Sequence, residues 1–265
     1  MNIGFIGFGN MAKAIAHGLL KNKDNQLRAA APSLTIGIDE HGIHTHYDNL
    51  AIIPSVDLLI LAVKPLQMPA VFAQIKHAIP ANCLMISIAA GISLPWFASQ
   101  TNKPIAIVRA MPNIAAAVGK AATPMIANEF VNNKQAELAE TIFSSIGVST
   151  WVTNEQQIDS FTALSGSGPA YIFLFMEAMI KAAVSLGLDE GIAKIFTLQT
   201  FEGALSLATE NQMNLATLRQ QVTSPGGTTA AAVDVFTKQG LDKLVLSAMN
   251  AAFERACQLK TINHV

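Results

Sequence analysis

The stretch that decides the fold of the first half runs from Asn2 to Leu20 and reads NIGFIGFGNMAKAIAHGLL. Its first residues form a short apolar run, Gly7 and Gly9 follow at once, and the residues from Lys13 onward have helical spacing. In such a strand, turn and helix, the first glycine makes a tight turn and the second lets the backbone approach a pyrophosphate. Ala12 takes the third glycine position, where a small residue lets helix pack on strand. The stretch therefore predicts a dinucleotide site.

Composition narrows the class of protein. A chain of 265 residues with 51% hydrophobic and 13% charged residues is long enough for one large domain or two small ones. A formal net charge of -1 disfavours nucleic acid and an acidic membrane surface as partners. Two cysteines cannot form a disulfide framework, and the first residues lack the basic start and long apolar run of a signal peptide. A cytoplasmic location is expected.

Strands and helices alternate through the first half. The run from Val56 to Ala62 is apolar throughout, as in a parallel strand buried on both faces. The pattern predicts a doubly wound, Rossmann-like α/β domain over residues 1–153, with the carboxyl ends of its strands lining a cofactor crevice. Further strands are expected at Leu27–Ala31, Cys83–Ile88, Pro104–Ala110, Thr123–Ala127 and Ser149–Val152, and helices at Leu66–Ala78 and Asn133–Ile146.

The end of the second expected strand bears on the choice of cofactor. An NAD site normally places Asp or Glu there, but the strand runs into Pro32-Ser33-Leu34-Thr35. Ser33 and Thr35 offer hydroxyls to a 2′-phosphate, so NADPH is favoured. Asp39 lies close enough in sequence to keep NADH as the alternative.

Three histidines, His41, His44 and His46, invite a test for a metal site. Two of them would share one face of a short strand, but no third ligand or set of acids accompanies them. We expect no metal site and solvent-facing imidazoles. Asn49 follows at the start of a loop or short helix, where capping is its default role.

Helical spacing replaces strand signals from Glu155 onward, so an all-helical domain is expected over residues 154–265. The run from Ala170 to Met176 is apolar on every side and must be buried all round. It is too short and interrupted to span a bilayer, and the domain has little interior. A homodimer through this domain is predicted, the alternative being a central helix of a monomeric bundle.

The segment Ser224-Pro225-Gly226-Gly227-Thr228-Thr229 separates two expected helices. Its glycines permit unusual backbone angles, and the first N–H groups of the following helix attract a carboxylate or phosphate. The alternative is a helix–helix turn with hydroxyl caps. No histidine falls in the candidate loops, which disfavours carbonyl reduction with a histidine proton relay and favours a substrate such as an imine.

Five blocks in order resemble the pyrroline-5-carboxylate reductase family. They are Gly7–Ala12, Ala62–Pro65, Ala89–Gly91, Leu164–Tyr171 and Ser224–Thr229. The resemblance covers nearly the whole chain and implies reduction of 1-pyrroline-5-carboxylate to L-proline by NADPH or NADH, the last step of proline biosynthesis. It does not distinguish a dimer from a higher assembly of dimers.

The resemblance also implies roles for individual residues. Thr229 would stand near the imine nitrogen, either donating a proton or orienting the substrate. The implied cofactor residues are Gly7, Phe8, Gly9, Asn10, Met11, Ser33, Asn49, Ala62, Val63, Lys64, Pro65, Ala89, Ala90 and Gly91, and the implied substrate residues are Val222, Ser224, Gly226, Gly227, Thr228 and Thr229.

The chain departs from the family pattern at two places. Asn214-Leu215 stands where a His-Pro pair is common, and residues 32–47 are short for the helix expected after the second strand. Two other functions remain open at this point. One is a 3-hydroxy-acid dehydrogenase relative that uses Lys64 or another lysine as acid and base, and the other is a non-catalytic nucleotide-binding regulator.

Overall fold

The first 151 residues supply every strand of a nine-stranded sheet in the computed structural model, which describes residues 1–210 and 213–262. The order is β3-β4-β2-β1-β5-β6-β7-β8-β9. Because the chain moves outward from β1 in both directions, the carboxyl ends of β1, β2 and β5 meet at a switch point. The strands are β1 (Asn2–Ile6), β2 (Gln26–Ala30), β3 (Gly37–Ile38), β4 (His44–His46), β5 (Leu58–Leu61), β6 (Leu84–Ser87), β7 (Ile107–Ala110), β8 (Ala121–Ala127) and β9 (Gly147–Trp151).

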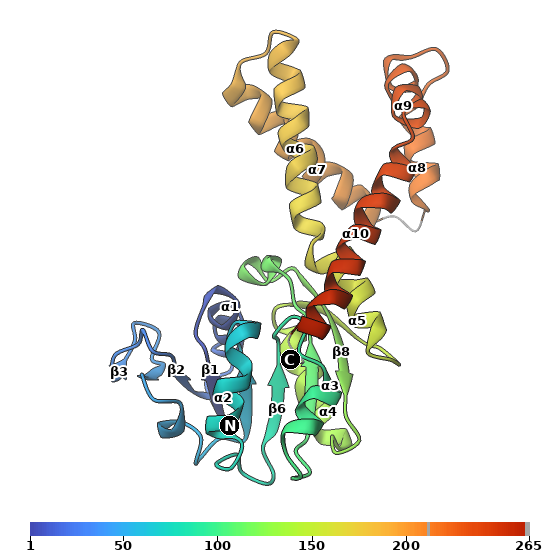
Figure 1. Cartoon of the computed structure of the whole chain (residues 1–265). Coiled ribbons are helices and arrows are strands. Elements are labelled where there is room, and N and C mark those ends of the chain that lie inside the picture. The colour runs from blue at the N-terminus through green and yellow to red at the C-terminus, as the bar shows by residue number, and fades with distance from the viewer. Residues whose placement is uncertain (211–212, 263–265) are drawn as a thin grey trace. The chain divides into compact units, whose positions relative to one another are not determined.

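Helices cover both faces of this sheet (Figure 1). Residues of α1 (Asn10–Leu19) and α4 (Asn133–Ser144) join one buried apolar cluster, and residues of α2 (Met68–Ile75) and α3 (Leu94–Gln100) join the other. All four residues of β5 are buried, as its apolar run predicted. The doubly wound fold expected from the sequence is confirmed.

Two local features differ from the sequence expectations. The chain after β2 forms a hairpin, in which β3 pairs antiparallel with β4, where the fold ordinarily has a helix. Helix α3 was not expected, although Ser93 caps it by accepting a hydrogen bond from the Trp96 N–H at 3.1 Å. Among the described residues of the first unit, three 3₁₀ turns complete the connections: η1 (Asn49–Ala51), η2 (Pro65–Gln67) and η3 (Ile114–Val118).

The second half is helical, as predicted. The helices are α5 (Gln156–Phe161), the π-helical turn η4 (Thr162–Gly166), α6 (Gly168–Ser185), α7 (Glu190–Glu210), α8 (Leu215–Gln221), α9 (Thr228–Lys238) and α10 (Leu241–Ile262).

Packing divides the chain into two compact units. The first consists of Met1–Pro169 together with Ala251–Val265, and the second of Ala170–Asn250. The last turns of α10 thus pack with the nucleotide-binding fold. The boundary predicted between residues 153 and 154 follows sequence pattern rather than packing, and it stays a prediction.

A buried ion cluster anchors α5 and the end of α10 in the first unit. The Arg109 guanidinium of β7 donates to Glu155 at 2.6 Å and lies 4.0 Å from Asp159. Asp159 also pairs with Lys260 of α10. The side chains of Arg109 and Asp159 are 3% and 2% exposed, so these charges depend on each other for stabilisation. The cluster joins β7, α5 and α10, whose residues lie far apart in sequence: Arg109 and Glu155 alone are 46 residues apart.

The second unit exposes large apolar side chains. Phe173 and Leu174 of α6 are 57% and 67% exposed, and Ile195 and Phe196 of α7 are comparable. Helix α6 was expected to be buried all round, yet within the described chain none of its residues is buried by the chain itself. By length and composition, the helical run from Gln156 to Ser185 also meets the minimum for crossing a membrane. An exposed apolar surface of this kind indicates an interaction site, either for another protein subunit or for a lipid membrane.

Candidate active site

The predicted cofactor residues of the first unit lie at one edge of the sheet, where parallel strands end. Gly7 follows β1, Ala62 follows β5, and Ala89 stands two residues beyond β6. Backbone hydrogen bonds hold these ends together: the Gly7 N–H donates to the Ala30 carbonyl at 2.8 Å, and the Ala62 N–H to the Ile6 carbonyl at 2.8 Å. This edge is where α/β folds of this type bind ligands.

The turn between β1 and α1 fits a pyrophosphate. Gly7 has a φ of 82°, and a Cβ there would lie 2.8 Å from the Ala62 backbone, so this position requires glycine. A Cβ on Gly9 would meet no heavy atom within 4 Å, which leaves space in front of the helix. No side chain caps α1 and no acid stands in its first turn. Its N–H groups therefore stay available to an anion, with Phe8, Asn10 and Met11 around them.

The end of β2 lacks a free carboxylate. Ser33 lies in the turn that follows the strand. Asp39, the alternative that would favour NADH, uses one oxygen, Oδ1, to accept from the N–H groups of His41 and Ile43, each at 2.9 Å. This oxygen shapes the hairpin between β3 and β4. The arrangement leaves the preference for NADPH standing as a prediction.

Asn49 has a different local role from the one expected. It is the first residue of η1, and Asp48 is the cap, accepting from the Leu50 N–H at 3.0 Å. The Asn49 amide instead donates to Gln74 of α2 at 2.9 Å. The expectation that Asn49 caps is wrong, because the preceding Asp48 takes that position; its contact with a cofactor stays a prediction.

The remaining cofactor residues follow β5 and β6. Val63 and Lys64 lead into η2, where Pro65 is the first residue. Ala89 and Ala90 lead into Gly91, whose φ of 74° allows the chain to turn toward α3. The placement of a flat ring beside these small residues stays a prediction.

The predicted substrate residues all lie in the second unit, from the end of α8 to the first turn of α9. Gly226 has a φ of 70°, and the Gly227 N–H donates to the Ser224 carbonyl at 3.0 Å to close the turn. Thr228 and Thr229 form the first turn of α9, which no side chain caps and which has no acid in its first turn. Val222 is 64% exposed beside this loop. The open helix end is suited to a carboxylate.

The preceding helix differs in this respect. Asn214, which replaces the His-Pro pair of the family pattern, caps α8 by accepting from the Thr217 N–H at 2.9 Å. The departure thus provides the cap that helix α8 needs, while α9 stays uncapped.

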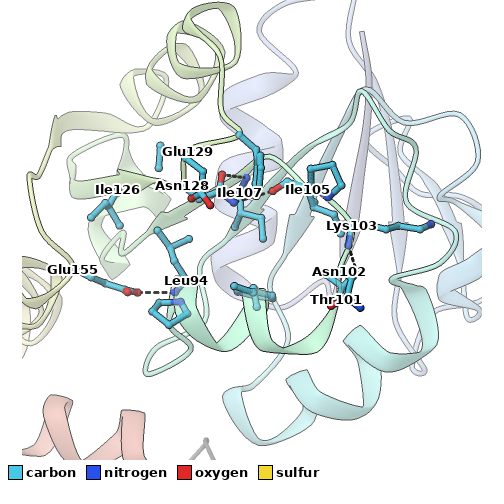
Figure 2. A pocket seen from close by; sticks show the side chains of 16 residues that line it. Leu94, Thr101, Asn102, Lys103, Ile105, Ile107, Ile126, Asn128, Glu129 and Glu155 are labelled. Carbon is cyan, nitrogen blue, oxygen red and sulfur yellow. Dashed lines mark hydrogen bonds between the residues drawn. The ribbon is translucent and has the colours of Figure 1, made fainter.

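A pocket of about 670 Å³ lies elsewhere, on the α3 side of the sheet (Figure 2). Leu94, Ile105, Ile107 and Ile126 contribute apolar walls, and Glu155 accepts a hydrogen bond from the Leu94 N–H at 2.9 Å. None of the predicted cofactor or substrate residues lines it. Volume alone therefore does not identify the site.

Sequence reasoning missed several polar groups of the first unit. Asn113, 8% exposed, donates from its amide to the Ser165 carbonyl at 2.9 Å, which ties the loop after β7 to η4. Arg109 is the charge in an otherwise apolar strand, and that contrast was a usable signal of a buried ion pair. Its partners lie too far along the chain to be inferred from spacing.

Burial disfavours the thiolate form of both cysteines. Burial, with a smaller contribution from the Asp57 charge, raises the pKa of Cys83 to about 12. Desolvation and then the Asp159 carboxylate raise the pKa of Cys257. Both thiols are therefore protonated at neutral pH. Cys83 precedes β6 and Cys257 lies in α10, so neither follows the carboxyl end of a strand, where the cofactor residues lie.

Comparisons with known proteins match the strand-rich part and the helical part of the chain to two different family models. Residues 155–259 match the model of the pyrroline-5-carboxylate reductase dimerisation domain, so the chain carries that domain. Residues 2–91 match a model described as NADP oxidoreductase, coenzyme F420-dependent. The N-terminal part is thus an NAD(P)-binding domain.

Full-length relatives are more specific. A pyrroline-5-carboxylate reductase of Pseudomonas aeruginosa is 39% identical over 262 residues, covering 97% of this chain and 96% of its own. The structure of a Coxiella burnetii pyrroline-5-carboxylate reductase is 42% identical with a TM-score of 0.90, covering 97% and 98% of the two chains. A Plasmodium falciparum pyrroline carboxylate reductase, solved with NADP bound, is 29% identical with a TM-score of 0.89 and 98% coverage of both. The chain belongs to the pyrroline-5-carboxylate reductase family.

Proposed function

We propose that this protein reduces 1-pyrroline-5-carboxylate to L-proline with a nicotinamide cofactor, the last step of proline biosynthesis. The observation that carries the proposal is the uncapped start of α9, formed by Gly227, Thr228 and Thr229, in a chain of this family. Free N–H groups at this helix end suit the carboxylate of a small cyclic imino acid. NADPH is the proposed cofactor, because Ser33 follows β2 and one oxygen of Asp39 is engaged in its own turn.

The nucleotide would lie along the carboxyl edge of the sheet. The pyrophosphate would lie at the uncapped start of α1, from Gly7 to Met11, and the flat ring against Ala89, Ala90 and Gly91. Asn49 and Ala62 to Pro65 are proposed for the ribose side. When bound, the reduced nicotinamide supplies a hydride, and every other contribution belongs to the chain.

The chain's residues act on the substrate by holding and orienting it. The N–H groups of Thr228 and Thr229 bind the carboxylate, which fixes the ring, while the Gly227 N–H closes the turn on the Ser224 carbonyl. Val222 and Ser224 border the substrate. The protonated imine nitrogen makes the neighbouring carbon electrophilic, so a strong acid from the protein is not required. The Thr229 hydroxyl, in the first turn of α9, is proposed to hydrogen-bond the nitrogen and set its orientation.

The assembly is proposed to be a homodimer through the helical half. The apolar side chains exposed on α6 and α7 lie within the matched dimerisation domain. A second subunit therefore explains the apolar run from Gln156 to Ser185 better than lipid does. The protein is proposed to be cytoplasmic, and dimers of this kind are open to assembly into a larger particle.

The test is a steady-state assay with purified protein. We expect oxidation of NADPH only when pyrroline-5-carboxylate is supplied, and a lower kcat/KM with NADH. Thr229→Ala should lower kcat by roughly tenfold or more while the Kd of NADPH holds, because the hydroxyl acts on substrate alone. Thr237→Ala, in the last turn of the same helix, is the matched control. No turnover with either nucleotide would refute the proposal.

A further inference from the structure

The hairpin after β2 brings two aromatic side chains to the ligand edge of the first unit. Strand β4 runs parallel to β2, with Ala30 opposite His46, and the Ala31 N–H donates to the His46 carbonyl at 3.1 Å. The carboxyl end of β4 therefore lies at the same edge as the turn at Gly7. Tyr47 is the first residue beyond this strand.

These two rings form a small exposed surface. Their centroids lie 4.8 Å apart and their planes differ by 31°, while Tyr47 is 59% exposed. Exposed aromatic faces at a ligand edge are suited to stacking on a purine base.

The backbone fixes the orientation of the imidazole. The Asp48 N–H donates to Nδ1 of His46 at 2.8 Å. Since Nδ1 is the acceptor, the proton of the neutral ring is on Nε2, which makes that nitrogen a donor. An imidazole held in this way can donate to a phosphate oxygen without first being protonated.

The position of this pair suits the adenosine half of the cofactor. In the sheet order, β4 is separated from β1 by β2 alone, so the end of β4 lies about 10 Å from the phosphate turn after β1, from a strand spacing of ~4.8 Å. A ribose and base attached to that phosphate extend over such a distance. The expected acid is missing from the end of β2, and one carboxylate oxygen of Asp39 accepts hydrogen bonds within the hairpin.

We propose that Tyr47 and His46 form an adenosine shelf, in which Tyr47 stacks on the adenine and Nε2 of His46 donates to the 2′-phosphate. This inference rests on the proposed NADPH-dependent function and names specificity-determining residues for it. The shelf gives the hairpin a function: it places these rings where the fold ordinarily has a helix. The shelf predicts that NADPH binds better than NADH because of one imidazole.

Direct binding to the full-length protein tests the shelf without relying on turnover. We would titrate the protein by calorimetry with NADPH, NADH, adenosine 2′,5′-bisphosphate and adenosine 5′-monophosphate. All four ligands carry the adenine base and only two carry a 2′-phosphate, so the contribution of the base to binding can be separated from that of the 2′-phosphate. Tyr47→Ala should weaken all four by roughly five- to tenfold, and Tyr47→Phe should restore binding because the ring is kept. His46→Ala should weaken NADPH and the bisphosphate by about tenfold more than the other two.

His44→Ala is the matched control, since His44 lies on the same strand two residues away from the edge. Its affinities should equal those of the wild type. If Tyr47→Ala and His46→Ala both stay within about twofold of the wild type, the shelf is wrong, and intact turnover in the same preparations would leave the proposed function standing. If the wild-type protein binds neither nucleotide, both proposals fail together.

Discussion

Neutralising Asp159 should destabilise the protein far more than removing an exposed ion pair of similar geometry. Asp159 is 2% exposed at its side chain, pairs with Lys260, and lies 4.0 Å from Arg109. Asp159→Asn keeps the shape but leaves two cations short of a partner. Breaking a buried pair costs about 3–5 kcal/mol. We expect the lower end, about 3 kcal/mol, because Arg109 keeps Glu155 and the Lys260 side chain, 22% exposed, can turn toward water.

The matched control is the pair formed by Asp234 and Lys238. Its 2.6 Å separation is shorter than most ion pairs, but its side chains are 55% and 74% exposed, and it joins adjacent turns of one helix. Asp234→Asn should therefore cost at most about 0.5 kcal/mol, since water and salt screen the charges. Burial, and not distance, is the variable that differs between the two substitutions.

Thermal unfolding at a fixed protein concentration is the assay, because the stability of a dimer depends on concentration. For a chain of this size, each kcal/mol moves Tm by roughly 2–4 °C, so Asp159→Asn should lower Tm by roughly 6–12 °C and Asp234→Asn by no more than about 2 °C. The double variant with Lys260→Met should recover part of the loss, since it removes the unpaired lysine. Equal shifts for the two single variants would refute the reasoning from burial.

Three further outcomes are expected. Gly7→Ala should lower Tm, because φ is 82° and the new Cβ would lie 2.8 Å from the Ala62 backbone. Gly9→Ala, where the new Cβ would meet no heavy atom within 4 Å, should keep Tm and weaken only the binding of NADPH. Equal Tm values for the two variants would contradict this prediction. Gly227→Val should abolish binding of a proline analogue in calorimetry while NADPH still binds, since the added side chain enters the turn 3.2 Å from the Ser224 carbonyl; surviving analogue binding would mean that the substrate loop is misassigned. Because burial raises the pKa of Cys83 to about 12, the folded state keeps a proton that the unfolded thiol loses above about pH 9. Stability should fall by about 1.4 kcal/mol per pH unit between those values, and Cys83→Ala should remove that part of the slope in alkaline denaturation.

Much of the fold could be predicted because its signals are local. The four apolar residues of β5 and the glycine turn at residue 7 each identify an element without reference to the rest of the chain. The hairpin and α3 were missed because short elements carry few periodic residues: β3 has two residues and α3 seven. The Ser93-Leu94-Pro95 start of α3 was nevertheless a readable helix signal.

The candidate site likewise has residues that local sequence signals reveal and residues that they do not. The glycine turns at residues 7 and 226 were readable, since only glycine tolerates their backbone angles. The rings of His46 and Tyr47 were not, because their placement follows from the pairing of β4 with β2. The ion cluster was hidden for the same reason: Glu155 and Arg109 are 46 residues apart, and no pattern in a single sequence reveals which distant residues meet.

Because the end of α10 packs in the first unit, the second unit is inserted in the sequence between two parts of the first unit. This order has a consequence for folding during synthesis. Asp159 is synthesised 98 residues before Cys257 reaches it, and the whole segment from Ala170 to Asn250 must emerge in between. Until then Asp159 lacks Lys260 as its partner. A chain emerging from the ribosome can therefore assemble its sheet early, but it can close this unit only after the end of α10 has emerged.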